Sequence, residues 1–176
     1  MIPVEIIEKA KRVKVLVVDI DGVMTDGRII YSTYGEELKF FDVQDGFGIT
    51  LLHRAGIKTV IITAKKSKIV KHRARDLKVT KAYQGFIDKA TPFNDILKRF
   101  NVTPEEVCFM GDDLIDIPVL KHAGLAVAVP NAVEEVRSSA HYITAKIGGR
   151  GAVREICDLI LKSQGKWELV TAKYFE

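Results

Sequence analysis

Two carboxylates lie one residue apart in the stretch Val15 to Val23. The four aliphatic residues before Asp19 predict a central strand that is covered on both faces. Asp19 and Asp21 would then emerge at the carboxyl end of this strand, where open α/β sheets bind ligands. Two acids this close repel each other, so a shared proton or a cation must compensate them. The pattern indicates a divalent-ion site, with a turn-capping Asp19 and a solvated Asp21 as the alternative.

Further polar residues follow other predicted strands. Thr63 ends a second buried strand, and Asp112 ends a third, with Asp113 next to it and Asp116 one helical turn later. Lys89 opens the helix before that third strand. If the strands are neighbours, these groups meet at one edge of the sheet. Taken singly, each has a simpler explanation as a loop hydroxyl, a surface lysine or a helix cap.

Strands and helices alternate along the whole chain, which is typical of an α/β fold with a doubly wound, Rossmann-like parallel sheet. The predicted strands are 15–18, 57–62, 82–83, 107–110, 125–129 and 142–143. The predicted helices are 3–10, 45–55, 67–77, 92–100, 113–122, 133–137 and 152–162. Asp45 is the expected N-cap of the second of these helices.

One segment departs from this alternation. Residues 28–31 and 37–41 predict two strands joined around Gly35, a β-hairpin flap spanning about residues 28–41. A two-stranded hairpin this rich in Ile, Tyr and Phe is marginal alone and needs a partner surface. The tail, about residues 166–176, carries Trp167, Tyr174 and Phe175 in a polar setting, so it is expected to pack on a partner or to be disordered.

The composition predicts one soluble domain over residues 1–176, with 47% hydrophobic and 28% charged residues. No apolar run approaches a membrane span and residues 1–14 show no secretory pattern, so a cytoplasmic protein is expected. Cys108 and Cys157 are predicted to be small core residues, and the four histidines form no ligand pattern. The net charge of +4 would favour anionic partners, but Lys and Arg are interspersed with acids, so the charge alone excludes little. Because the sequence has no continuous basic track and no apolar run of membrane length, no nucleic acid or membrane partner is expected.

The ordered polar set resembles the four motifs of the haloacid dehalogenase superfamily of phosphatases, which here read Asp19-Ile20-Asp21-Gly22, Thr63, Lys89 and Gly111-Asp112-Asp113-Leu114-Ile115-Asp116. The resemblance implies a two-step phosphoryl transfer. Asp19 would attack phosphorus and form an aspartyl phosphate, while Asp21 would protonate the leaving oxygen and later deprotonate the attacking water. Thr63 and Lys89 would bind the phosphoryl oxygens, where charge gathers in the transition state.

The same resemblance implies Mg²⁺ as the cofactor. Asp19, Asp112 and the backbone carbonyl of Asp21 would hold the ion, which offsets the repulsion between acid and phosphate. Asp113 and Asp116 would orient the metal ligands, the lysine ammonium or bound waters.

Many members of this superfamily carry a cap domain over the site. Here only 41 residues separate Asp21 from Thr63, and 25 separate Thr63 from Lys89, so neither gap holds a cap domain. The site is then covered either by a macromolecular substrate or by a neighbouring subunit. The apolar hairpin favours the subunit, because self-association would bury it.

A narrower resemblance points to the 3-deoxy-D-manno-octulosonate 8-phosphate phosphatases. It rests on the runs Asp21 to Arg28, Gly35 to Phe41, Gln44 to Gly46 and Gly148 to Glu155. It implies a small phosphorylated sugar acid as substrate, a step in lipopolysaccharide precursor synthesis, and a homotetramer assembled through the hairpin, with residues and in some cases the tail reaching a neighbouring site. The implied substrate contacts are Asp42, Val43, Gln44, Asp45, Gly46, Thr50, Lys65 and Arg73, to which the loop residue Arg150 is added.

One departure from that family leaves alternatives open. The family commonly has Gly-Arg where this chain has Ala64-Lys65, and lysine offers a point charge in place of a planar fork. A phosphatase of a related nonulosonic (sialic-type) acid 9-phosphate is therefore the nearest alternative. A capless phosphatase of nucleic-acid ends or proteins, and a phosphate-accepting receiver domain, are more distant ones.

Overall fold

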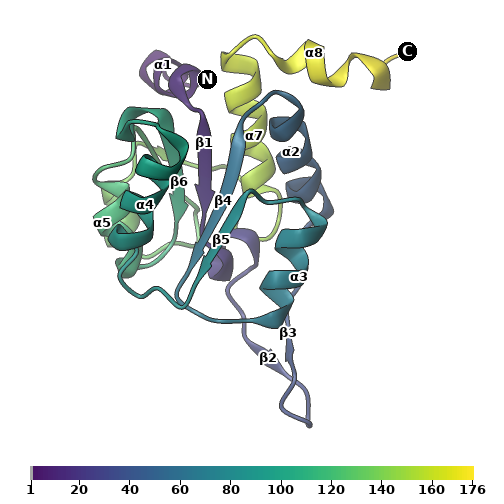
Figure 1. Ribbon diagram of the computed structural model, residues 1–176, viewed down its shortest axis with the longest axis vertical. Coiled ribbons are helices and arrows are strands. Elements are labelled where there is room, and N and C mark those ends of the chain that lie inside the picture. Colours follow the sequence, from purple (N-terminus) through teal and green to yellow (C-terminus); the bar gives the residue numbers. More distant parts are fainter. Residues whose placement is uncertain (1) are drawn as a thin grey trace.

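The computed structural model of the protein describes residues 2–176 and is built on a six-stranded sheet (Figure 1). The strands lie in the order β5-β4-β1-β6-β7-β8, and every neighbouring pair is parallel. Their bounds are β1 Val15–Val18, β4 Lys58–Thr63, β5 Lys81–Gln84, β6 Val107–Gly111, β7 Leu125–Ala128 and β8 Tyr142–Ile143. The predicted doubly wound parallel sheet is confirmed, and all six predicted strands are present.

Helices cover both faces of this sheet. Those that Figure 1 labels α2, α3 and α7 lie on one side, and α4 and α5 lie on the other. The bounds are α1 Val4–Arg12, α2 Val43–Arg54, α3 Lys68–Asp76, α4 Ala90–Phe100, α5 Ile117–Leu120, α6 Glu134–Ser139, α7 Ala152–Ser163 and α8 Trp167–Thr171. The chain leaves β1 towards β4 and β5 and then returns to β6 on its other side, so the carboxyl end of β1 is a topological switch point.

The core is centred on β1. Its four residues are fully buried, and the register aligns Val18 with Ile61 on one side and Met110 on the other. Burying one such aliphatic side chain stabilises the fold by roughly 1.5–3 kcal/mol. Cys108 and Cys157 are free thiols inside this core, as expected. Within residues 2–176, no helix has both the length and the apolar character needed to cross a membrane.

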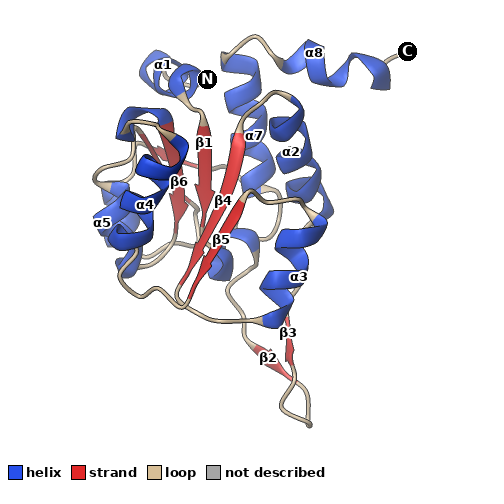
Figure 2. Cartoon of the chain, in the orientation of Figure 1, coloured by secondary structure: helices blue, strands red, loops and turns tan. Residues whose placement is uncertain are grey.

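The hairpin is present, but its strands are shorter than predicted. β2 spans Ile30–Tyr31 and β3 spans Glu37–Leu38, and the pair extends beyond the sheet at one end of the molecule (Figure 2). Within this chain the ribbon leaves Tyr34 and Phe40 largely exposed. Two strands without a covering layer cannot keep a long ladder, which explains the short pairing.

The predicted N-cap of α2 was wrong. The cap is Asp42, whose Oδ1 accepts hydrogen bonds from the backbone N–H groups of Gln44 (2.6 Å) and Asp45 (3.3 Å). Asp45 lies inside the first turn and is buried, and its Oδ1 accepts a hydrogen bond from the backbone N–H of Arg154 at 2.8 Å. Its carboxylate therefore satisfies the start of α7.

The tail is ordered, which contradicts the expected disorder, while its packing on a partner stays a prediction. Its residues form α8 and a short turn, Ala172–Tyr174, and they pack on α2 of their own chain. The Tyr174 hydroxyl accepts a 2.6 Å hydrogen bond from Arg54, and its ring meets Phe47 edge-on at 5.6 Å. Edge-on aromatic pairs stabilise a contact beyond the effect of the apolar area that they bury. These contacts therefore hold the tail on its own chain.

Candidate active site

The chain makes a sharp, irregular turn, Ile20–Met24, directly after β1 and Asp19. Gly22 has a φ of 94°, and a Cβ at that position would lie 1.9 Å from Asp112 Oδ2, so only glycine fits. The side chain of Asn131, which sequence reasoning missed, braces the turn. Its Nδ2 donates to the Gly22 carbonyl at 2.9 Å, and its Oδ1 accepts from Gly148 N–H at 2.8 Å. The turn is thereby held close to Asp112.

Lys89 lies just before α4 and is fully buried. Its Nζ lies 2.5 Å from Asp116 Oδ1 and 3.1 Å from Asp19 Oδ1. Asp116 is also fully buried, and its Oδ2 accepts the backbone N–H groups of Asp112 (2.9 Å) and Asp113 (3.2 Å). A lysine is fully buried only when it is paired, so the surface-lysine explanation of Lys89 is wrong.

The structure brings three carboxylates together at this edge. Single oxygens of Asp19, Asp112 and Asp116 all lie within 4.8 Å of one another. Burial raises the pKa of Asp19, against the opposing effect of Lys89, and burial together with the Asp19 charge raises the pKa of Asp112 to about 8. Among residues 2–176, the buried Asp112 Oδ1 has no hydrogen-bond partner. An orphaned oxygen among crowded acids is the environment that a hard divalent cation would fit.

Asp21 lies at the same edge and is partly exposed. Its Oδ1 accepts a 2.5 Å bond from Lys39 Nζ, which also lies 2.9 Å from Glu37 Oε1. The Lys39 side chain is only 1% exposed. Burial lowers the pKa of this ammonium, but its bonds to Asp21 and Glu37 outweigh burial and raise it. Sequence reasoning missed Lys39, for which the only signal was a cation on an apolar hairpin strand.

Thr63 and Lys65 follow the neighbouring strand. Thr63 is buried at the carboxyl end of β4, two residues past the Ile61 that pairs with Val18 of β1. Its Oγ1 accepts a 3.4 Å hydrogen bond from the backbone N–H of Lys65, whose own side chain is exposed. This edge therefore carries a buried hydroxyl and an exposed cation side by side.

The start of α2 meets Arg73 of α3. Arg73 Nη2 donates to the Asp42 carbonyl at 3.1 Å, its guanidinium lies 5.3 Å from the Phe41 ring centre, and a Cβ at Gly46 would come within 2.7 Å of it. Thr50 Oγ1 donates back to the Gly46 carbonyl at 3.2 Å. Arg73 is thus held at the helix N-terminus and is half-buried, unlike a residue of a solvated face.

The remaining predicted residues lie outside this cluster. Asp113 is exposed, and its Oδ1 accepts from Leu114 N–H at 2.7 Å, so it caps the turn Leu114–Asp116. Val43 and Arg150 are exposed around a hollow that Asp42 also lines, and Gln44 is exposed beside Gly151. The structure does not bring these side chains to the three carboxylates.

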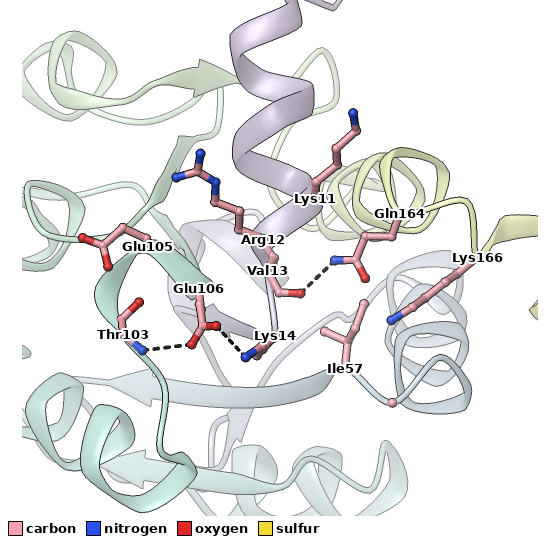
Figure 3. A pocket seen from close by; sticks show the side chains of 11 residues that line it. Lys11, Arg12, Val13, Lys14, Ile57, Thr103, Glu105, Glu106, Gln164 and Lys166 are labelled. Carbon is pink, nitrogen blue, oxygen red and sulfur yellow. Dashed lines mark hydrogen bonds and ion pairs between the residues drawn. The ribbon is translucent and has the colours of Figure 1, made fainter.

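A separate pocket opens at the opposite end of the strands, next to the amino ends of β1, β4 and β6 (Figure 3). Lys14 pairs there with Glu106 at 2.5 Å, and Gln164 donates to the Val13 carbonyl at 2.8 Å. This pocket lies away from the switch point of the sheet, and the described residues that line it hold no cluster of carboxylates around a buried cation. We therefore assign the site to the edge that carries the carboxylates.

Comparisons with known proteins identify the family of this chain. Residues 78–156 match the family model of haloacid dehalogenase-like hydrolases. The 3-deoxy-D-manno-octulosonate 8-phosphate phosphatase of Yersinia pestis is 46% identical over 167 residues, covering 95% of this chain and 89% of that protein.

Two solved structures are similar over almost their whole length. A Pseudomonas syringae structure described under the YrbI phosphatase family has a TM-score of 0.97 at 41% identity and covers 99% of both chains. The phosphatase of Moraxella catarrhalis, solved with magnesium, phosphate and 3-deoxy-D-manno-octulosonate, has a TM-score of 0.94 at 41% identity and covers 97% of this chain and 98% of that chain.

Proposed function

Because this chain belongs to the 3-deoxy-D-manno-octulosonate 8-phosphate phosphatases within the haloacid dehalogenase-like hydrolases, we propose that it hydrolyses that sugar phosphate to the free acid and inorganic phosphate. The family makes it a phosphoric monoester hydrolase, which excludes the receiver-domain alternative. The buried cluster of Asp19, Lys89 and Asp112 at the switch point is the observation that supports the proposal most directly. The reaction would serve lipopolysaccharide precursor synthesis.

Asp19 would act as the nucleophile. One of its carboxylate oxygens forms a bond to phosphorus while the bond from phosphorus to the sugar oxygen breaks, and Asp21 gives that oxygen a proton. Water then attacks the aspartyl phosphate, Asp21 takes a proton from it, and the bond between Asp19 and phosphorus breaks. Lys89 lies 3.1 Å from Asp19, which supports a role for its ammonium in binding phosphoryl oxygens. The Thr63 hydroxyl would bind them from the neighbouring strand.

The metal would be held by Asp19, Asp112 and the backbone carbonyl of Asp21. Mg²⁺ is our proposal for this ion, and it would supply positive charge between the acids and the phosphate. Asp116 is already engaged with Lys89 and two backbone N–H groups, so we assign it to fixing the ammonium. We no longer propose that Asp113 orients the metal ligands, because its carboxylate caps its own turn.

The sugar acid would be recognised beside this centre. The N-terminus of α2, at residues 42–46 and Thr50, offers backbone N–H groups that favour an anion, and Arg73 is held there by the Asp42 carbonyl. The Asp45 side chain is buried and its Oδ1 is engaged with α7, so its backbone is the part that a ligand would meet. Lys65 and Arg73 would meet the sugar carboxylate, and Arg150 would be directed at the site of a neighbouring subunit.

We also propose a homotetramer that assembles through the hairpin. Tyr31, Tyr34 and Phe40 are 66%, 90% and 67% exposed, which is a large apolar area for a ribbon of two short strands. A homotetramer would bury this area and would cover a site that has no cap domain. Sedimentation measurements test this directly, and a Tyr34→Asp, Phe40→Asp variant should be monomeric.

A phosphate-release screen tests the proposed substrate. The eight-carbon and nine-carbon keto acid phosphates should be compared in Mg²⁺ and in EDTA, and we expect the eight-carbon ester to have the higher kcat/KM. A tenfold preference for the nine-carbon ester would assign the chain to the nonulosonic alternative. Lys65→Arg should raise affinity for the preferred substrate without changing kcat, since the guanidinium binds a carboxylate through two donors.

A further inference from the structure

We infer that Lys39 is a positioning residue for the Asp21 carboxylate, and that Glu37 and Ser67 hold Lys39 in place. The inference rests on the proposed function, because it takes Asp21 as the group that exchanges the proton. It assigns the hairpin a part in the chemistry of its own subunit, in addition to its part in assembly.

A continuous chain of hydrogen bonds carries the inference. The backbone N–H of Ser67 donates to Gln84 Oε1 at 2.7 Å, and the Ser67 hydroxyl donates to Glu37 Oε2 at 3.0 Å. The other oxygen of Glu37 lies 2.9 Å from Lys39 Nζ, which bonds Asp21 Oδ1 at 2.5 Å. The chain joins the carboxyl end of β5 and the start of α3 to the acid after β1, through residues of the hairpin.

Lys39 is buried, which indicates that its bonds to Asp21 and Glu37 are not incidental surface contacts. Its side chain is 1% exposed, although it leaves a ribbon whose neighbouring residues Leu38 and Phe40 are 48% and 67% exposed. Lysine is almost never buried without a partner, and here both partners are carboxylates. The hairpin therefore turns one long side chain inward, and that side chain ends at the proposed proton donor.

Asp21 depends on this contact for its orientation. Its side chain is 25% exposed, and within residues 2–176 Lys39 is the one side chain that bonds its carboxylate. With Oδ1 fixed by the ammonium, Oδ2 is the oxygen left to carry the proton to the leaving group. A misplaced acid loses much of its rate advantage, since proton transfer needs hydrogen-bond geometry.

Esters with different leaving groups distinguish a role of Lys39 in proton transfer from a role in structural support alone. A sugar alkoxide must receive a proton as its bond to phosphorus breaks, whereas p-nitrophenolate is a stable anion that departs without one. The ratio kcat/KM covers the steps up to departure of the first product, so it reports this bond cleavage for both esters. A variant that only loosens the site lowers kcat/KM for both esters alike.

The test compares Lys39→Met with Glu36→Gln, a neighbouring hairpin substitution on an exposed side chain outside the chain of bonds. We expect Lys39→Met to lower kcat/KM for the sugar phosphate by about 30- to 100-fold, with less than about a threefold loss for p-nitrophenyl phosphate. Lys39→Arg should restore much of the sugar phosphate rate, and Glu37→Gln should show the same asymmetry more weakly. Glu36→Gln should change neither. Equal losses for the two esters in Lys39→Met would overturn the inference.

Asp21→Asn, measured in parallel, distinguishes this failure from failure of the proposed function. If Asp21→Asn shows the leaving-group asymmetry and Lys39→Met does not, only the positioning role is wrong. If Asp21→Asn also lacks it, the proton-transfer role of Asp21 and the inference fall together. Should the eight-carbon ester prove not to be the substrate, the best alkyl ester of the screen replaces it. Should Lys39→Met not fold, Glu37→Gln and Ser67→Ala decide the question by the same ratio.

Discussion

Replacing Lys89 by methionine tests the buried charge cluster most directly. The substitution keeps the length of the side chain and removes the ammonium that lies 2.5 Å from Asp116 and 3.1 Å from Asp19. Both carboxylates then remain in the interior without their cation. Breaking a buried pair by removing one partner costs about 3–5 kcal/mol of the free energy of unfolding. Two backbone N–H groups still serve Asp116, so we expect about 3 kcal/mol.

A second substitution shows how much of the lost stability is due to charge and how much to packing. In the Lys89→Met background, Asp116→Asn removes one of the two unpaired acids and retains its volume. We therefore expect the double variant to recover about 1.5 kcal/mol or more relative to Lys89→Met alone. Lys98→Met is the matched control, because Lys98 is an exposed lysine on α4, the helix that follows Lys89. Its free energy of unfolding should stay within about 0.5 kcal/mol of the wild type.

Urea unfolding in EDTA, followed by circular dichroism and by the fluorescence of Trp167, provides the measurement. Protein concentration must be constant across variants, because self-association contributes to apparent stability. A loss below about 1 kcal/mol in Lys89→Met, with the double variant no more stable, would refute the account of a buried ammonium that compensates two acids. Wild-type activity in Lys89→Met would refute its proposed contact with phosphoryl oxygens.

Three further predictions concern the acids and the turn between them. Asp19→Asn should abolish turnover of both the sugar phosphate and p-nitrophenyl phosphate while the circular dichroism spectrum is unchanged, and substantial residual activity would exclude Asp19 as the nucleophile. Because the pKa values of Asp19 and Asp112 are raised, the folded metal-free protein binds more protons than the unfolded chain. Its thermal stability in EDTA should therefore fall between pH 5 and 8, and Mg²⁺ should flatten this slope; a stability that rises with pH in EDTA would contradict the assignment. Gly22→Ala should lose Mg²⁺-dependent stabilisation and cost more than Gly56→Ala, which has a similar φ of 79° but open space around it; equal costs would mean that the contact with Asp112 is unimportant.

The sheet could be predicted because its strands are continuous aliphatic runs. Residues of β1 and β6 are buried on both faces, so Val15–Val18 and Val107–Gly111 need no alternation of polar side chains to be recognised. The polar residues that end these strands mark the edge where a site forms. The fold, and the location proposed for the site, could be predicted from these aliphatic runs together with the order of the motifs.

Contacts between distant parts of the chain could not be predicted in the same way. Asp42 and Asp45 are both suitable N-caps and lie three residues apart, so local sequence does not choose between them. The choice depends on Arg154, 109 residues further on, whose backbone N–H takes the Asp45 carboxylate. The order of the tail could not be predicted for the same reason, since Tyr174 contacts Arg54 and Phe47 only in the folded chain.

The burial of Lys39 and Lys89 could not be predicted from each residue taken alone. A lysine alone is best assigned to the surface, and only the motif order singled out Lys89, while nothing singled out Lys39. In the fold, Lys89 lies between Asp19 and Asp116, and Lys39 lies between Asp21 and Glu37. Each acid of the first motif therefore contacts an ammonium that it shares with a second acid. The two lysine ammonium groups therefore offset part of the repulsion between Asp19 and Asp21. Within residues 2–176, Asp112 Oδ1 is buried and has no hydrogen-bond partner, so the charge of Asp112 would be compensated by a bound cation. We therefore expect Asp112→Asn to weaken metal binding more than Asp21→Asn does.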